Sequence, residues 1–133
     1  MLFWPVLVNM ALVIFLYFKL VAVKKPAVAE GTVDEERRSL HDDAWPDSVM
    51  KVNNCIRNQF EVPVLFYAVM WIITSVGAQG PIALTLAWVF VVTRILHARE
   101  HIGDNFVPRR RRYFTIGVVM VLLLVLRAAW ELL

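Results

Sequence analysis

Four long apolar stretches constrain the fold of this chain more than any other feature of its sequence. They lie within residues 1–23, 48–76, 81–102 and 111–131. An α-helix needs about 20 predominantly apolar residues to cross the ~30 Å hydrocarbon layer of a membrane. The chain has 133 residues, of which 59% are hydrophobic, so it has room for four such helices and short connections. The sequence therefore predicts an all-α, integral membrane four-helix bundle in which residues 1–133 form a single domain.

The first apolar stretch has two interpretations, a spanning helix and a secretory signal peptide. A signal peptide carries a basic segment before its apolar core and a site of small residues after it. Residues 1–23 show neither feature before Lys24 and Lys25. Lys19, near the end of the stretch, can extend its ammonium group to the membrane interface. We therefore expect a spanning helix here.

Turn-forming residues separate the stretches. Residues 24–46 form a polar loop with charges of both signs, and Pro46 before an Asp-Ser pair predicts a turn followed by a helix N-cap. The sequence Gly-Ala-Gln-Gly-Pro at residues 77–81 predicts a tight turn, and residues 103–108 predict a further break.

The basic residues indicate how the bundle is oriented. They gather in the first and third loops, whereas the turn at residues 77–80 has none. By the positive-inside rule, the first and third loops face the cytoplasm and both termini face the other side. In a bacterial cell this predicts a multi-pass protein of the inner (plasma) membrane. The run Arg109–Arg112 lies between membrane helices with no basic domain around it, so we expect lipid headgroups and no nucleic acid as its partners.

Several ionisable side chains are predicted at one depth in the membrane. Glu61 lies roughly 22 Å from the outer end of its helix and Arg94 roughly 20 Å from the same end, at 1.5 Å per residue. His97 lies one turn further in, and Arg109–Arg112 enter the fourth helix at that level. Ionisable groups inside a membrane are costly, so their convergence predicts a structural or functional role.

Helical spacing places these polar side chains on shared faces. One set is Asn54, Asn58 and Glu61 with Arg57 beside them, and the other is Arg94, His97 and His101. One interpretation is a structural brace, in which Glu61 pairs with Arg94 or Arg57. The other is a binding site for a charged or polar small molecule at the membrane edge. The two interpretations are compatible, and both remain open at this point.

The residue types limit the chemistry of such a site. We find no third ligand that would complete a metal site with His97 and His101, and we expect no bound metal. No nucleophile elbow and no glycine-rich phosphate loop is present. Arginine, asparagine and glutamate remain. Arginine binds carboxylates and stabilises anions, so the site suits an acidic ligand or a thiol that ionises to a thiolate.

Two segments resemble the MAPEG family, the membrane-associated proteins in eicosanoid and glutathione metabolism. Residues 57–66, Arg-Asn-Gln-Phe-Glu-Val-Pro-Val-Leu-Phe, resemble the family's second-helix signature of an Asn, a Glu three residues later and a Pro. Residues 94–97, Arg-Ile-Leu-His, resemble the third-helix Arg-x-x-His. The length, the four-helix layout and the orientation are also similar along nearly the whole chain.

The resemblance implies a homotrimer that binds glutathione as co-substrate between adjacent subunits. It implies a glutathione transferase or peroxidase that acts on small lipophilic electrophiles. By position, Asn58 and Glu61 would hold glutathione, Arg94 and His97 would support the site, and Arg110 would stabilise the thiolate as the catalytic residue.

Two positions depart from the family pattern. Asn54 stands where family enzymes usually carry an Arg, with Arg57 as the candidate replacement, and His101 stands where many carry a Tyr. These departures keep an alternative open, a non-catalytic member that binds a lipid or a protein partner. A third hypothesis is a small proton-coupled transporter that uses Glu61.

Overall fold

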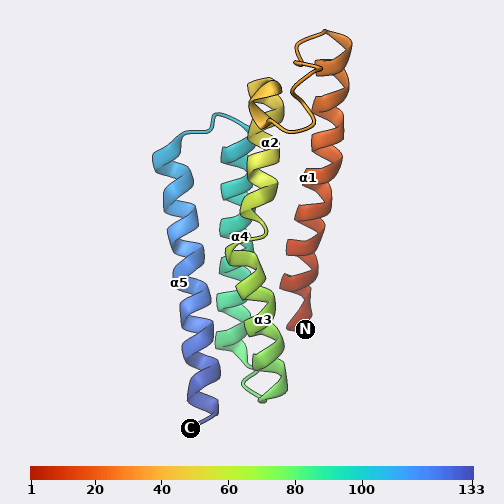
Figure 1. Cartoon of the computed structure of the whole chain (residues 1–133). Helices are drawn as coiled ribbons and strands as arrows, with labels where there is room; N and C mark the ends of the chain where they lie inside the picture. Colours follow the sequence, from red (N-terminus) through yellow and green to blue (C-terminus); the bar gives the residue numbers. More distant parts are fainter.

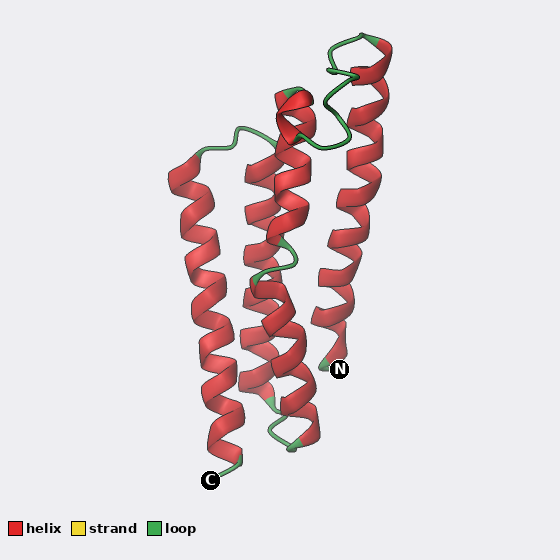
Figure 2. Cartoon of the chain, in the orientation of Figure 1, coloured by secondary structure: helices red, strands yellow, loops and turns green.

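The computed structural model describes all residues from 1 to 133 and contains helices but no strands (Figures 1 and 2). The α-helices are α1 (Phe3–Ala29), α2 (Asp47–Asn58), α3 (Val62–Ser75), α4 (Pro81–Ile102) and α5 (Val107–Glu131). A short 3-10 helix spans Asp42–Ala44 before α2. Because α2 and α3 follow each other along one line, the five α-helices form a bundle of four columns (Figure 1). The predicted all-helical membrane bundle is confirmed.

Three of the helices are long and apolar enough to cross a membrane by themselves. These are α1 with 27 residues, α4 with 22 and α5 with 25. The remaining column combines α2, with 12 residues, and α3, with 14. Large apolar side chains are exposed along α1, α3 and α5, as expected where a helix faces lipid. The chain is therefore an integral membrane protein.

The predicted continuous helix over residues 48–76 is wrong, because the structure divides it into α2 and α3. The division falls at residues 59–61, and Pro63 occupies the first turn of α3. Proline has no N–H to bond to the preceding turn, and its ring clashes with the carbonyl four residues earlier. The helical face expected to join Asn54, Asn58 and Glu61 is consequently interrupted before Glu61.

Two other helix boundaries differ from the sequence expectation. The first helix was expected to end at residue 23, but α1 continues to Ala29, beyond the two lysines. Charged residues are compatible with a helix in water, so the end of the apolar run does not mark the end of the helix. The last helix was expected from residue 111, but α5 begins at Val107 with Pro108 in its first turn, where a missing N–H costs nothing. The bounds of α4 agree with the expectation.

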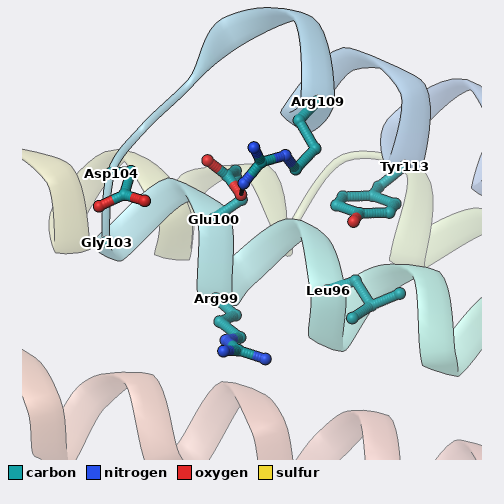
Figure 3. Close-up of a pocket in the computed structure, with 7 residues that line it drawn as sticks. All are labelled: Leu96, Arg99, Glu100, Gly103, Asp104, Arg109 and Tyr113. Atoms are coloured by element: carbon teal, nitrogen blue, oxygen red, sulfur yellow. Dashed lines mark hydrogen bonds and ion pairs between the residues drawn. The ribbon is translucent and has the colours of Figure 1, made fainter.

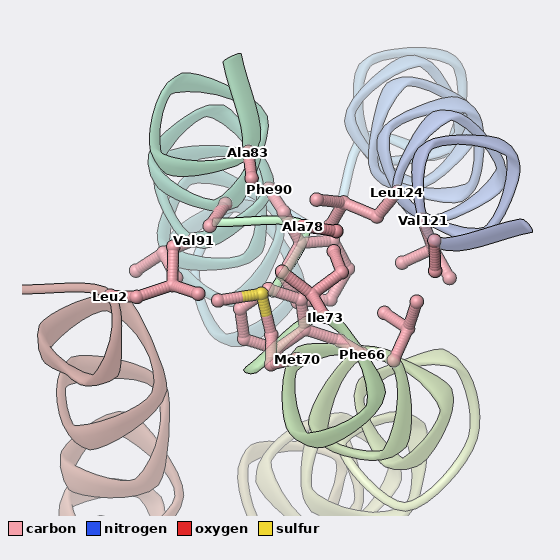
Figure 4. Packing of buried hydrophobic residues seen from close by; sticks show 13 residues of the cluster. Leu2, Phe66, Met70, Ile73, Ala78, Ala83, Phe90, Val91, Val121 and Leu124 are labelled. Carbon is pink, nitrogen blue, oxygen red and sulfur yellow. The ribbon is translucent and has the colours of Figure 1, made fainter. Parts of the chain in front are cut away.

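The main apolar core lies in the half of the bundle nearer the termini, between α3, α4 and α5 (Figure 4). The rings of Phe66 and Phe90 stack there with centroids 4.2 Å apart, and both residues are fully buried. Small residues allow the helices to approach closely. A Cβ atom at Gly117 of α5 would lie 3.2 Å from the hydroxyl of Thr93 and 3.7 Å from the Phe90 ring.

The other end of the bundle carries the α1–α2 and α4–α5 connections and most of the charge. Both termini and the α3–α4 turn lie at one end, and the α1–α2 and α4–α5 connections lie at the opposite end (Figure 1). The first loop is fixed by the ammonium of Lys24 above the Trp45 ring at 4.5 Å, and by an ion pair between Arg57 and Asp42. We call this half of the molecule the loop end.

Candidate functional site

Polar side chains from α2, α4, α5 and the α4–α5 connection enclose a cavity at the loop end. Its volume is about 400 Å³. The lining residues are Asp47, Met50, Lys51, Asn54, Asn58, His101, Asn105 and Arg110. Only one of the eight is hydrophobic, and two cations stand against one carboxylate. The cavity, here called the main cavity, therefore suits a polar ligand that carries negative charge.

Arg110 reaches the main cavity from the first turns of α5. Its Nη1 donates a hydrogen bond to Oδ1 of Asn105 at 2.5 Å, and its backbone N–H bonds to the carbonyl of Phe106. The N-terminus of a helix carries partial positive charge, which adds to the charge of the guanidinium. This part of the cavity is thus favourable for an anion.

A smaller cavity adjoins the main one. Its volume is about 260 Å³, and it shares Asn58 and Arg110 with the main cavity. Its remaining lining residues are His97, Val107, Arg111 and Phe114. The two cavities meet at Arg110, so this residue lies between a polar chamber and one lined in part by apolar side chains.

Arg94 is the most deeply buried charged side chain, with 1% of its surface exposed. Its Nη2 donates to the backbone carbonyl of Asn58 at 3.2 Å, which ties α4 to the end of α2. In a continuous helix, that carbonyl would accept the N–H of Val62. The break before α3 therefore leaves it available to Arg94. Arg94 lines neither cavity, and its Nε has no partner.

Asn58 and the two histidines connect α2 to α4 beside the cavities. Asn58 Nδ2 lies 3.0 Å from the carbonyl of Asn54 and 3.4 Å from Nδ1 of His101. The rings of His97 and His101 lie edge to face, with centroids 5.5 Å apart. His97 also lies against Phe114, and its Nδ1 has no hydrogen-bond partner.

The expected brace between Glu61 and an arginine is absent. Glu61 is exposed just before the start of α3 and forms no ion pair. Arg57 instead pairs with Asp42 in the first loop and lines a separate pocket beside Trp45. Of the sequence-predicted site residues, the structure brings together Asn54, Asn58, His97, His101 and Arg110 around the cavities. It leaves Arg57, Glu61 and Arg94 outside the cavity linings.

The sequence analysis missed three polar residues that line the main cavity, Asp47, Lys51 and Asn105, and the apolar Met50. The signal for Lys51 was present, because Lys51, Asn54 and Asn58 follow the i, i+3, i+7 spacing of one helical face. Asp47 lies one turn before Lys51 and belongs to the same face. Asn105 gave no such signal, since it lies in a connection whose path depends on tertiary contacts.

A second polar pocket of about 410 Å³ lies on the other side of the α4–α5 connection (Figure 3). The carboxylate of Glu100 stands at its centre and pairs with Nη1 of Arg109 at 3.0 Å. Leu96 and Tyr113 form the less polar part of its lining. Neighbouring arginines of α5 thus serve different pockets, Arg109 this one and Arg110 the main cavity.

The fold and the cavities define a class of protein, an integral membrane helical bundle with a cation-lined polar cavity at one end. The comparison with known families agrees with this class and narrows it. Residues 2–130 match the MAPEG family, so the chain belongs to that family. No curated protein and no solved structure matches the chain at a significant level.

Proposed function

We propose that this MAPEG protein is a glutathione-dependent transferase or peroxidase that acts on lipophilic electrophiles from the bilayer. The observation that carries the proposal is the position of Arg110, a guanidinium between a polar cavity and a partly apolar one in a chain of this family. Glutathione is a peptide with an amine, two carboxylates and a thiol. Its polar groups match the main cavity, and an apolar electrophile matches the adjoining one.

The charged and the neutral side chains of the main cavity bind different groups of glutathione. Lys51 attracts a carboxylate of glutathione, and Asp47 attracts the amine. Asn54, Asn58 and His101 supply neutral hydrogen-bonding groups along the cavity. Family enzymes usually carry an Arg at the position of Asn54. Lys51 lies one helical turn before Asn54 and compensates for the missing Arg.

Arg110 is the catalytic residue of the proposed reaction. Its positive charge favours the thiolate over the thiol of bound glutathione, and the thiolate is the nucleophile. In the transferase reaction the sulfur forms a bond to the electrophilic carbon, while the bond to the leaving group breaks and its electron pair leaves with that group. The thiol proton passes to water at the open side of the cavity.

The same proposal includes a homotrimer with its first and third loops in the cytoplasm. Glu61 supports the assembly, because an exposed, unpaired carboxylate beside the apolar α3 is costly in a membrane until a neighbouring copy covers it. The charged loop end supports the orientation, since it holds the basic loops. In a bacterial cell the location would be the inner (plasma) membrane.

The test is conjugation of a chlorinated aromatic to glutathione by the purified protein in detergent. Arg110→Ala should lower kcat by on the order of 10²–10³-fold, the effect of removing one preorganised charge. Arg112→Ala is the matched control, because Arg112 lies on the same turns of α5 and lines neither cavity. A wild-type protein without turnover, or equal effects of the two substitutions, would contradict the proposal.

A second candidate function is non-catalytic binding of a lipid or a protein partner. The observation that favours it is the position of Arg57, which pairs with Asp42 outside the main cavity and so does not replace the family Arg absent at Asn54. Isothermal titration with glutathione and mass spectrometry of co-purified lipids separate the two candidates. No heat from glutathione, together with one lipid in stoichiometric amount, would favour this second function.

A further inference from the structure

The connection between α4 and α5 is held in one conformation by side chains that the family resemblance does not assign. It comprises residues 103–106. The carbonyl of Gly103 accepts a hydrogen bond from Nζ of Lys51 at 3.2 Å, which ties the connection to α2. A Cβ atom at Gly103 would lie only 3.0 Å from the carbonyl oxygen of Arg99, so the connection leaves α4 without room for a side chain there.

Asn105 is the one residue other than glycine with a left-handed backbone, with φ of 55°. Asparagine tolerates this conformation better than most residues. Its N–H donates to the carbonyl of Glu100 at 2.8 Å, which closes the connection back onto α4. Its side-chain Oδ1 accepts the hydrogen bond from Arg110 at 2.5 Å, at the wall of the main cavity.

Glu100 fixes the other side of the same connection. It has 9% of its surface exposed, and its two carboxylate oxygens have different partners. Oε1 accepts a hydrogen bond from the N–H of Phe106 at 3.1 Å. Oε2 accepts one from Nη1 of Arg109 at 3.0 Å, and Figure 3 shows these two side chains together. The carboxylate thus bonds to an N–H at the start of α5 that has no partner within the helix. Its negative charge also interacts favourably with the positive end of the helix dipole. The start of α5 is held by Glu100 on one side and by Asn105 on the other.

We propose that Asn105 is a positioning residue for Arg110, and that its side-chain carbonyl holds the guanidinium at the junction of the two cavities. The proposal rests on the proposed role of Arg110 in binding the thiolate. An arginine side chain has many rotamers, and fixing it before the ligand binds removes that entropic cost. The Asn105 carbonyl is a neutral acceptor, so it orients the guanidinium and leaves its charge available to the anion. Glu100 keeps Asn105 at the correct distance through the connection.

The decisive variant is Asn105→Gly, because glycine adopts the left-handed backbone freely and lacks the side-chain acceptor. The control for loop flexibility is Asp104→Gly, which changes the neighbouring residue and removes no hydrogen bond to Arg110. In Asn105→Gly we expect kcat for conjugation to fall about tenfold, with the KM for the electrophile unchanged. We expect Asp104→Gly to keep the wild-type kcat.

A second readout needs no glutathione and is therefore independent of the proposed function. The order of the Arg110 Nε–H group is measured by nitrogen-15 NMR relaxation in detergent, with the signal assigned by its loss in Arg110→Lys. We expect the group to be ordered in the wild type, mobile in Asn105→Gly, and ordered again in Asn105→Asp, which retains the acceptor. Unchanged order or unchanged kcat in Asn105→Gly would overturn the inference. A wild type without turnover would instead refute the proposed function, and the NMR comparison would still decide the inference.

Discussion

The two ends of the bundle are stabilised in different ways, although α1, α4 and α5 run through both. In the half nearer the termini, α3, α4 and α5 are joined by apolar contacts such as the stacked rings of Phe66 and Phe90. At the loop end, two smaller apolar clusters join α1, α2 and α4 without including α5, and polar side chains line the cavities. Arg94 bonds to a carbonyl of α2, and Glu100 bonds to the start of α5.

This difference indicates a division of labour along the bundle. Close packing resists change at every point of contact, because any lost volume costs dispersion energy. Individual hydrogen bonds fix directions while leaving space between them, which is what a binding cavity needs. The apolar half, together with the two small apolar clusters of the loop end, therefore holds the helices together, and the polar lining of the cavities is free to arrange charged groups around a ligand. If the division holds, substitutions in the apolar half change stability, and substitutions in the lining of the cavities change binding or turnover.

The largest effect is expected in the apolar half, for Phe90→Ala. Phe90 is fully buried between Phe66 and the close approach at Gly117, so its removal leaves a cavity that rigid helices cannot fill. We expect the free energy of unfolding to fall by about 3 kcal/mol, with kcat per folded molecule unchanged. Unfolding by denaturing detergent in mixed micelles measures the first quantity.

Trp88→Ala is the matched control for this prediction, because Trp88 is a large aromatic of the same helix that is partly exposed. Its loss should cost less than about 1 kcal/mol. An equal cost for both substitutions would show that the buried face of α4 contributes no more to stability than its outer face.

At the loop end, Lys51→Met should weaken ligand binding without unfolding the protein. The substitution keeps most of the aliphatic stem and removes the ammonium, which lines the main cavity and also donates to the carbonyl of Gly103. A charge-assisted hydrogen bond is worth about 1.5–3 kcal/mol, so we expect the Kd for glutathione to rise about ten- to a hundredfold. Titration calorimetry measures the Kd, and a thermal unfolding scan should give a midpoint near that of the wild type.

Lys25→Met removes an equal charge from α1, outside the main cavity. It should leave the Kd unchanged, whereas Lys51→Arg should retain most of the affinity. If Lys25→Met weakened binding as much as Lys51→Met, the protein's overall charge would be responsible and the contact with the cavity would not.

The same division explains how much of the molecule its sequence predicts. The apolar runs predicted α1, α4 and α5 as spanning helices, since crossing a membrane depends on length and composition. They did not predict the break before α3. Pro63 stands inside an apolar run that looks continuous, and a proline in a membrane helix either bends it or ends it according to its neighbours. The start of α5 was placed too late because Pro108 is compatible with a first turn as well as with a loop.

The sequence predicted the level of Arg94 along the bundle, but it did not predict which group Arg94 contacts. Arg94 lies at the same level as the end of α2, as the rise per residue indicated, but it bonds to a backbone carbonyl of Asn58 and not to Glu61. Which group a helical side chain contacts depends on the rotation of its helix about the helix axis. Helices that are apolar on nearly all sides carry little information about that rotation. The contact between Asn105 and Arg110 depends further on the path of a connection, which no periodic pattern describes.

The hydrogen bond between Asn9 of α1 and Tyr67 of α3 is a polar contact within the half nearer the termini. Asn9 Nδ2 donates to the hydroxyl of Tyr67 at 2.7 Å, and Asn9 is fully buried. A double-mutant cycle with Asn9→Leu and Tyr67→Phe should give a coupling energy of about 1 kcal/mol, typical of polar contacts between membrane helices. Detergent unfolding of the four proteins measures it. A coupling energy of zero would show that this hydrogen bond does not help to hold α1 against α3.

The smallest effect is expected for Arg37→Gln in the first loop, because Arg37 and its partner Asp43 line none of the cavities described above. Arg37 Nη2 bonds to both carboxylate oxygens of Asp43, at 3.0 and 2.9 Å, and this hydrogen bond lowers the pKa of Asp43. A lowered carboxyl pKa contributes stability above the unfolded-state pKa, near 4, that is lost as the pH falls through the folded-state value. Both side chains are exposed to water, which screens the pair, so Arg37→Gln should leave the thermal midpoint unchanged at neutral pH. NMR titration should show the Asp43 pKa rising in the variant. A large loss of thermal stability would mean that this loop, like the α4–α5 connection, is held by specific polar contacts on which the fold depends.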